Sequence, residues 1–197
     1  ECASVVSVNC LGRDRPGTSG QVLEHLRVSD HQGQLRVTGN AFLGYLNQPE
    51  TWYPDYVDTG DIGSVDSEGY VTIEGRAGNL LINSYGRNIS PEWVESELAS
   101  AGVFRQALVF GDGRPYCTAL LCPLDEHCSD AAIQSAIDTV NVRLPDYARV
   151  GSWARLPGPL TTADGLLTDN GRPRRNLIEL AYGHLIDTLY PESKELK

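Results

Sequence analysis

The sequence predicts an α+β protein with a small antiparallel β unit, residues 1–77, followed by a compact α+β domain, residues 78–197. Short β-branched runs separated by turn residues fill the first part. Beyond Gly78, apolar runs of strand length alternate with three stretches of helical period. The charge changes as well: residues 1–75 hold 11 acids and 4 arginines, whereas residues 76–197 hold 15 acids and 12 basic residues.

Four strands are expected in the first part. Turn residues separate β-branched runs at residues 2–10, 22–28, 34–38 and 69–74, and residues 29–33 form the expected turn of the middle pair. In the last strand, alternation predicts Val71 and Ile73 on one face, with Tyr70 and Thr72 on the other.

The second part should open with a short strand at residues 80–82 and a capped helix. Ser90 followed by Pro91 marks the helix start, because the serine hydroxyl accepts a backbone N–H and proline tolerates the first helical position. Val94 and Leu98 then follow at helical spacing, as does Ala101.

A hairpin and two more helices complete the prediction. Strands at residues 106–110 and 116–121 flank the turn Gly111-Asp112-Gly113. A helix at 129–143 places Ile133, Ile137, Val140 and Leu144 on one stripe. Residues 145–159 are expected to connect it to a last helix at 174–190, with a stripe of Ile178, Tyr182, Leu185 and Leu189.

The composition is that of a globular protein, with 41% hydrophobic residues, 21% charged residues and a net charge of −10. Nucleic-acid binding is not expected, because neutralising phosphates needs a basic face. No apolar run approaches the ~18 residues of a membrane span, and no signal-peptide pattern is present, so a cytoplasmic protein is expected. Since the chain holds no methionine, it is expected to be a fragment or a processed product.

Five cysteines, at positions 2, 10, 117, 122 and 128, show no framework spacing, which favours free thiols in a reducing compartment. Cys117, Cys122, His127 and Cys128 could form a metal or redox site. Their spacing matches no standard pair of ligand turns, and a predicted strand separates the first two. A metal or redox module is therefore the least favoured hypothesis, which elemental analysis of the purified protein would test.

Four motifs lie between residues 39 and 95, and they read GNAFLGYLNQPET, TGD, GYVTIEGR and SYGRNISPEWVE. Asp61, in an expected turn after Thr59-Gly60, is ambiguous by itself. An aspartate there is typical of an Asx turn that binds its own backbone. Its carboxylate could instead accept two vicinal hydroxyls of a sugar. The combination of the four motifs favours the second function.

In this order and approximate spacing, the motifs resemble the domain junction of the AMP-forming acyl-CoA synthetases and related adenylate-forming ligases. The resemblance covers nearly the whole chain. It implies that residues 1–77 are the C-terminal β part of the large AMP-binding domain and residues 78–197 the small mobile lid domain. The remaining N-terminal part of the large domain, with the phosphate loop and the acyl pocket of the family, would be a partner of this chain.

The resemblance implies a role for each motif. Asp61 would bind the ribose of ATP or AMP, with Arg76 close to the same hydroxyls. Gly78 matches the hinge of the family, and glycine suits a hinge because it accepts φ angles that other residues avoid. The loop with Gly86 and Arg87 would face the pantetheine of CoA or the phosphopantetheine of a carrier protein.

Two further residues follow from the resemblance. Glu1 matches the glutamate that ends a Thr-Glu motif and helps to hold Mg²⁺ near the phosphates. At the C-terminus, long-chain members have Gly-Leu-Leu-Thr, three residues and a lysine that bridges the acyl carboxylate and the α-phosphate. Here the sequence from Gly165 to Thr168 is the same, but Arg172 replaces the lysine. Arg172, which keeps the charge as a planar fork, is the expected catalytic residue.

The resemblance thus implies an ATP-dependent, AMP-forming ligase that activates a carboxylic acid as an acyl-adenylate and transfers it to a pantetheine thiol. The missing lysine keeps open a second hypothesis, a catalytically degenerate member of the fold that acts as a binding or regulatory module. Arg172, Arg174 and Arg175 would then be a solvated basic start of the last helix, although basic residues there oppose the helix dipole.

Overall fold

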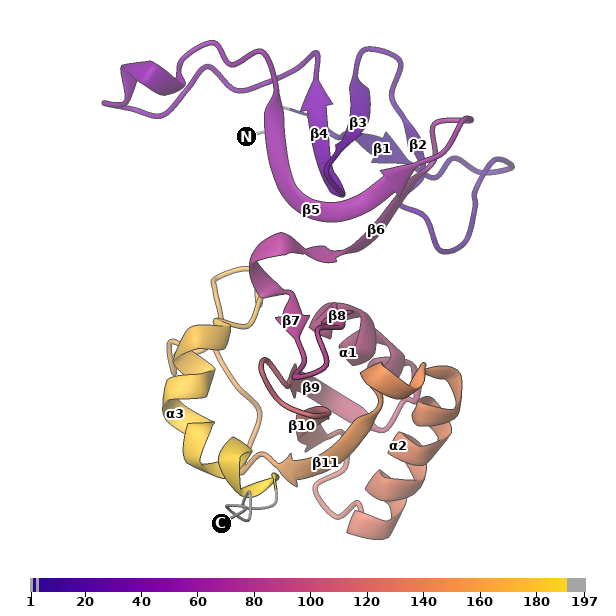
Figure 1. The fold of residues 1–197 in the computed structure, drawn as a ribbon, viewed down its shortest axis with the longest axis vertical. Helices are drawn as coiled ribbons and strands as arrows, with labels where there is room; N and C mark the ends of the chain where they lie inside the picture. The colour runs from indigo at the N-terminus through magenta and orange to yellow at the C-terminus, as the bar shows by residue number, and fades with distance from the viewer. Residues whose placement is uncertain (1, 3, 191–197) are drawn as a thin grey trace. The chain divides into compact units, whose positions relative to one another are not determined.

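The computed structural model describes residue 2 and residues 4–190, which fold into two compact units. The N-terminal unit extends to Leu80, and the C-terminal unit begins at Leu81. The first unit contains sheets and short 3-10 helices, and the second packs α-helices on a sheet (Figure 1). The predicted α+β fold class is therefore confirmed. The sequence places the boundary slightly earlier, after Ala77.

The N-terminal unit is organised around a four-stranded antiparallel sheet of order β3-β4-β5-β6 (Figure 1). Its strands are β3 (Arg27–His31), β4 (Gln34–Thr38), β5 (Val57–Val65) and β6 (Val71–Arg76). A separate pair consists of β1 (Ser7–Val8) and β2 (Gln21–Val22). Two 3-10 turns, η1 (Pro49–Thr51) and η2 (Ala77–Asn79), follow β4 and β6.

Strand predictions in this unit are only partly correct. The strand at 34–38 is confirmed, but the one at 22–28 is two separate strands, and the expected buried strand at 2–10 is wrong. In that segment the strand shrinks to Ser7–Val8, because it pairs with only two residues, and Val5 is 62% exposed. The turn after β3 is also tighter than predicted, since Gln32 and Gly33 alone form it, with φ of 56° and 81°.

The predicted faces of β6 are wrong. Tyr70 and Val71 are both buried, whereas Ile73 is 46% exposed. The register with β5 shifts between Ile62 and Gly63, so the strands do not keep a strict two-residue alternation. Tyr70 precedes β6 and is covered by a different part of the chain.

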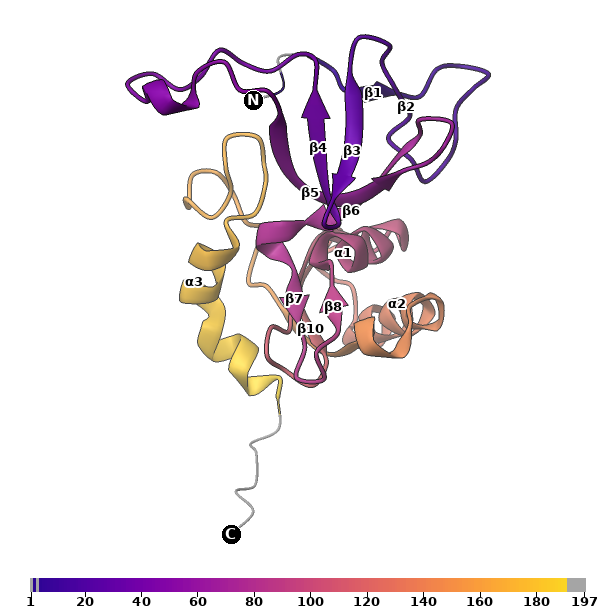
Figure 2. The same ribbon diagram turned by 45° about the horizontal axis from the view of Figure 1, so that its top comes forward.

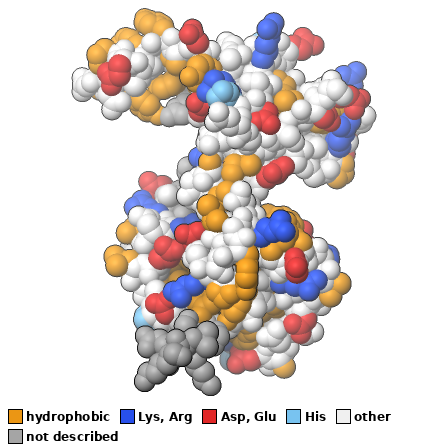
Figure 3. Space-filling view, viewed as in Figure 1, with side chains coloured by type: hydrophobic (Ala, Val, Ile, Leu, Met, Phe, Trp, Pro, Cys, Tyr) orange, Lys and Arg blue, Asp and Glu red, His pale blue; other side chains and the backbone are white. Residues whose placement is uncertain are grey.

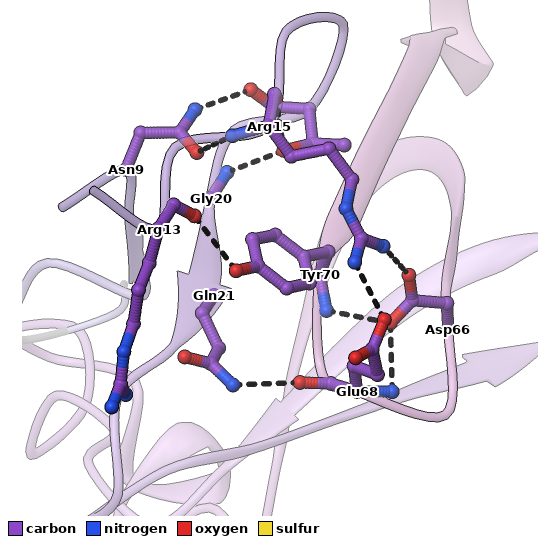
Figure 4. Close-up of polar contacts among 9 residues, drawn as sticks. Asn9, Arg13, Arg15, Gly20, Gln21, Asp66, Glu68 and Tyr70 are labelled. Carbon is purple, nitrogen blue, oxygen red and sulfur yellow. Dashed lines mark hydrogen bonds and ion pairs between the residues drawn. The ribbon is translucent and has the colours of Figure 1, made fainter. Parts of the chain in front are cut away.

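That cover is the loop of residues 9–20, which is fastened to the turn between β5 and β6 (Figure 4). The guanidinium of Arg15 lies 3.9 Å from the centroid of the Tyr70 ring and donates to Asp66 and Glu68 at 2.5 Å each. The Tyr70 hydroxyl donates to the Arg13 carbonyl at 2.7 Å. The Asp66 carboxylate accepts hydrogen bonds from the backbone N–H groups of Tyr70 and Glu68. These two bonds and the Arg15 guanidinium hold the pKa of the Asp66 carboxyl below its ordinary value. These contacts fix the turn end of the β5–β6 hairpin.

The C-terminal unit has three layers (Figures 1 and 2). Its mixed sheet has the order β11-β10-β9, with β9 (Phe104–Phe110) antiparallel and β11 (Val150–Arg155) parallel to β10 (Cys117–Pro123). Its helices are α1 (Pro91–Ser100), α2 (Asp130–Arg143) and α3 (Arg175–Thr188). A small hairpin of β7 (Leu81–Ile82) and β8 (Asn88–Ile89) precedes α1, and a 3-10 turn, η3 (Asp146–Ala148), precedes β11.

Alternation along the strands builds two cores on opposite faces of this sheet. Val109 and Ala119 pack with α1 and α2, whereas Leu108, Phe110 and Leu120 pack on the side of α3. The predicted cap of α1 is confirmed, since Ser90 accepts from the Trp93 N–H at 3.4 Å. The helix expected at 129–143 is present as α2, and the structure adds a cap, since Ser129 accepts from the Ala132 N–H at 3.2 Å. The predicted stripes of both helices are buried as well, except for Ala101 at the end of α1, which is only partly buried. No described helix is long and apolar enough to cross a membrane.

Two details of this unit differ from prediction. Residues 145–159, expected to be a connection, contain β11. This strand pairs with β10, which lies far away in sequence, so the residues of β11 alone do not indicate a strand. On α3, Ile178 is buried as predicted, whereas Tyr182, Leu185 and Leu189 are only partly buried. Ile186 and Tyr190, which the prediction did not include, are the other buried residues.

Candidate functional site

Asp61 and Arg76 lie opposite each other on β5 and β6, and their side chains meet. Arg76 Nη1 donates to Asp61 Oδ1 at 2.7 Å and to the Thr59 carbonyl at 2.8 Å. The Asp61 side chain is 28% exposed, so its carboxylate is held in place while remaining open to a ligand. The structure therefore brings together the two residues that the sequence assigns to one sugar-binding site.

The local backbone explains this geometry and corrects one prediction. Thr59-Gly60-Asp61 lies inside β5, not in a turn. Gly60 has a φ of +72°, which interrupts the regular strand at a position that suits glycine. The Thr59 hydroxyl accepts the Asp61 N–H at 3.0 Å and donates to the Leu35 carbonyl at 2.9 Å. A carboxylate fixed in this way can accept hydrogen bonds from two vicinal hydroxyls, and the neighbouring guanidinium balances its charge.

In the C-terminal unit, Gly86 and Arg87 lie in the turn between β7 and β8. The Asn83 side-chain oxygen organises this turn by accepting the N–H groups of Tyr85 and Arg87 at 3.0 and 2.9 Å. Gly86 has a φ of +74°, and a Cβ at this position would meet nothing within 4 Å. The positive φ thus favours glycine, and the space beside this backbone is open. The Arg87 guanidinium lies 5.8 Å from the ring centroid of Tyr147.

Arg172 lies in an exposed turn just before α3. Its N–H donates to the Thr168 hydroxyl at 3.0 Å, and its carbonyl accepts the Thr168 N–H at 2.8 Å. Within the described part of the chain, its guanidinium makes no hydrogen bond or ion pair. A pocket of about 310 Å³ adjoins this turn and is lined by residues that include Glu95, Arg105 and Gly171. Arg172 is therefore a cation available to a ligand.

A buried ion pair behind this turn was missed from the sequence. Arg175 Nη2 contacts both oxygens of Glu95 at 2.6 and 2.7 Å, and both side chains are only 14% exposed. Burial raises the pKa of the Glu95 carboxyl, against the opposing effect of Arg175. A charge beside Val94 and Leu98 on the apolar face of α1 was the available sequence signal, because a buried carboxylate needs a partner.

In the described part of the chain, no contacts support a role for the other predicted site residues. Gly78 lies in η2, outside the left-handed region of φ, and a Cβ there would meet nothing within 4 Å. Glu1, the expected Mg²⁺ ligand, lies outside the described residues. Among the residues that are described, no three His, Cys, Asp or Glu side chains could hold a metal ion together. Burial raises the pKa of the Cys117 thiol to about 11, so it stays protonated at neutral pH.

Comparisons with known proteins agree on one family. The model described as "AMP-binding enzyme C-terminal domain" matches residues 79–194. The long-chain-fatty-acid–CoA ligase FadD15 of Mycobacterium tuberculosis is 25% identical over 94% of this chain and 34% of its own length. The long-chain-fatty-acid–[acyl-carrier-protein] ligase AEE15 of Arabidopsis thaliana is 24% identical over 96% of this chain and 30% of its own length. The chain thus spans about a third of the length of these relatives.

Solved structures share the fold. The A domain of carboxylic acid reductase from Segniliparus rugosus, in complex with AMP and a co-purified carboxylic acid, aligns with a TM-score of 0.75 at 20% identity, covering 86% of this chain and 32% of that one. The anthranilate CoA ligase AuaEII, in complex with anthranoyl-AMP, gives a TM-score of 0.70 at 23% identity, covering 88% and 36%.

Proposed function

The chain belongs to the AMP-binding enzymes of the adenylate-forming ligase superfamily, and on that premise we propose that it is the C-terminal part of an ATP-dependent, AMP-forming acid–thiol ligase. The single observation that carries this proposal is the contact between Asp61 and Arg76, which presents a fixed, partly exposed carboxylate next to a cation. The fatty-acid ligases among its relatives favour a fatty acid as substrate.

An exposed apolar arm supports a larger parent protein. The arm, residues 41–56, projects from the sheet of the N-terminal unit and carries apolar side chains on its surface (Figures 1 and 3). Its large exposed residues are Leu43, Tyr45, Leu46, Trp52, Tyr53 and Tyr56. The arm is nonetheless ordered, since Trp52 Nε1 donates to the Tyr45 carbonyl at 3.0 Å. Such a built apolar surface fits burial against the remaining large domain.

The proposed reaction has two steps. A carboxylate oxygen of the acid attacks the α-phosphorus of ATP, pyrophosphate leaves, and an acyl-adenylate forms. The thiol sulfur of pantetheine then attacks the acyl carbonyl, the thiol proton is lost, and AMP leaves. In the first step Asp61 and Arg76 hold the ribose while Arg172 stabilises charge between the carboxylate and the α-phosphate; catalysis is mainly positioning and electrostatics.

The thiol acceptor fits the loop of Gly86 and Arg87. With no Cβ at Gly86 and open space around it, a slender pantetheine arm can pass close to the backbone. One relative is named as a CoA ligase and another as an acyl-carrier-protein ligase, so CoA and a carrier protein are both candidates. Mg²⁺ bound at the phosphates would neutralise part of their negative charge. We assign none of the described residues as its ligand.

The ribose contact gives the first prediction. In the full-length protein, Asp61→Ala should weaken AMP binding about tenfold to hundredfold, because hydrogen bonds to a charged group contribute ~1.5–3 kcal/mol. The preference for AMP over 2′-deoxy-AMP should also fall, which isothermal titration of both nucleotides would measure. Asp58→Ala is the matched control, since Asp58 also lies on β5 and pairs with an arginine, Arg36. Equal losses in both variants would refute the assignment of Asp61.

The hinge gives the second prediction. Between the two steps the C-terminal unit would turn about Gly78, exchanging the Arg172 face for the Gly86 face. Residues 77–79 should then exchange their amide hydrogens faster than β6 or β9, because a hinge opens without unfolding either unit. Hydrogen exchange with mass spectrometry measures this. Protection at residues 77–79 equal to that of β6 would argue against a hinge at Gly78.

One observation favours a second function. Arg172 stands where long-chain members of the family have lysine, and a guanidinium differs from an ammonium in shape and reach. The parent could therefore be a catalytically degenerate member that binds nucleotide without activating an acid. Such a protein would bind AMP through Asp61 and release no pyrophosphate from ATP.

A further inference from the structure

The pair Glu95–Arg175 occupies the free edge of the sheet in the C-terminal unit. Among the strands of the described residues, β9 pairs with β10 alone, and its other side pairs with no strand. On its other side, the Val109 N–H donates to Glu95 Oε1 at 2.7 Å, and the Val109 carbonyl accepts from Arg175 Nη1 at 3.0 Å. Both backbone groups of Val109 are thus bound by this ion pair. Helix α1, strand β9 and the start of α3 are joined at one point.

This point is the anchor for the first turn of α3. Arg175 is the first residue of the helix, and Arg174 before it forms no side-chain cap. No acid lies in the first turn, so the helix dipole is not balanced there by its own sequence. The start of α3 is instead held by Arg175, which reaches from the helix to α1 and β9.

Arg175 is three residues from Arg172, and the segment between and before them is closed by its own hydrogen bonds. The Arg174 N–H donates to the Leu166 carbonyl at 2.9 Å, and the Gly171 N–H to the Thr168 carbonyl at 2.7 Å. With the two bonds between Thr168 and Arg172, residues 166–174 form a compact turn with little freedom of its own. Leu166 and Leu167 pack one end of this turn against the core on the α3 side, and Arg175 fixes the other end, next to Arg172.

We propose that the Glu95–Arg175 pair is a positioning device that sets the place of Arg172 for acyl-adenylate formation. The proposal rests on the proposed function, in which Arg172 contacts the reacting groups. Glu95 and Arg175 do not contact them; they act through the turn at 166–174. The pair should therefore matter for the step that uses Arg172 and not for the step that uses the Gly86 loop.

The first test measures the turn without reference to activity. Glu95→Gln in the present chain should speed amide hydrogen exchange about tenfold in residues 166–174, because Arg175 then meets one neutral amide oxygen in place of two carboxylate oxygens and its hydrogen bonding to α1 weakens. Glu97→Gln is the matched control: Glu97 lies on the same helix and pairs with Arg143 of α2, away from the turn. If Glu95→Gln does not fold by circular dichroism, Arg175→Lys, which keeps the charge and loses the fork, replaces it. Unchanged exchange in residues 166–174 would overturn the proposal.

The second test is a double-mutant cycle in the full-length protein. Glu95→Gln should slow acyl-adenylate formation about tenfold when Arg172 is present, and should have no further effect in the Arg172→Ala background. Thioester formation from supplied acyl-adenylate should keep its rate, which a general loss of folding would lower. Additive effects of Glu95→Gln and Arg172→Ala would contradict positioning through Arg172. If the protein forms no acyl-adenylate, the proposed function fails, and the exchange experiment alone decides this proposal.

Discussion

Replacing Arg172 by alanine in the full-length protein should lower the rate of acyl-adenylate formation about a hundredfold or more. Removing one preorganised contact to developing charge typically costs ~3 kcal/mol of transition-state stabilisation. The described structure leaves the Arg172 guanidinium free of internal partners, so the substitution should not disturb the fold. Single-turnover formation of acyl-adenylate from ATP and acid measures the effect.

Thioester formation from a supplied acyl-adenylate is the internal control for Arg172→Ala. It should stay nearly unchanged, because that step uses the Gly86 loop. Arg172→Lys should retain or raise activity, since lysine stands at this position in long-chain members of the family. If the parent protein adenylates acids and Arg172→Ala changes nothing, the assignment of Arg172 is wrong. Activity that appears only in Arg172→Lys would show that the natural protein has lost catalysis.

Arg175→Ala should destabilise the C-terminal unit by about 3–5 kcal/mol, because it leaves the Glu95 carboxylate buried without its partner. The Val109 carbonyl loses its hydrogen bond at the same time. Urea unfolding followed by circular dichroism measures the change in the free energy of unfolding.

The matched control for that loss is Arg143→Ala. Arg143 pairs with Glu97 at 3.2 Å, but its side chain is 52% exposed, and exposed ion pairs contribute at most about 1 kcal/mol. Equal losses for Arg175→Ala and Arg143→Ala would show that burial does not set the strength of the Glu95–Arg175 pair.

Elements with local signals were predicted well. Ser90 marks the start of α1 because capping is decided within a few residues, and apolar stripes such as Ile133 and Ile137 follow from helical period. Strand β11 was missed because it depends on pairing with β10, a distant part of the chain. The strand expected at residues 2–10 was wrong for the same reason, since β-branched residues form a strand only where a partner exists.

The residues of the candidate site likewise include some that the sequence predicts and some that only the fold reveals. Asp61 and Arg76 were found because they fall in recognisable motifs, and the structure pairs them although Thr59-Gly60-Asp61 lies in a strand and not in a turn. Glu95 ends the motif SYGRNISPEWVE and Arg175 was interpreted as part of a solvated basic helix start, but their pairing was not predicted, because 80 positions separate them. Only the fold brings them together, and the charge on the apolar face of α1 was the single local sign.

The most direct test of the proposed function is exchange of labelled pyrophosphate into ATP by the full-length protein, measured with and without a panel of carboxylic acids. We expect exchange that depends on an acid, most strongly a fatty acid, and none by residues 1–197 alone, which lack the phosphate loop of the family. Binding of AMP without exchange for any acid would contradict the ligase and support the degenerate module. Strong exchange by residues 1–197 alone would contradict their assignment as part of a larger enzyme.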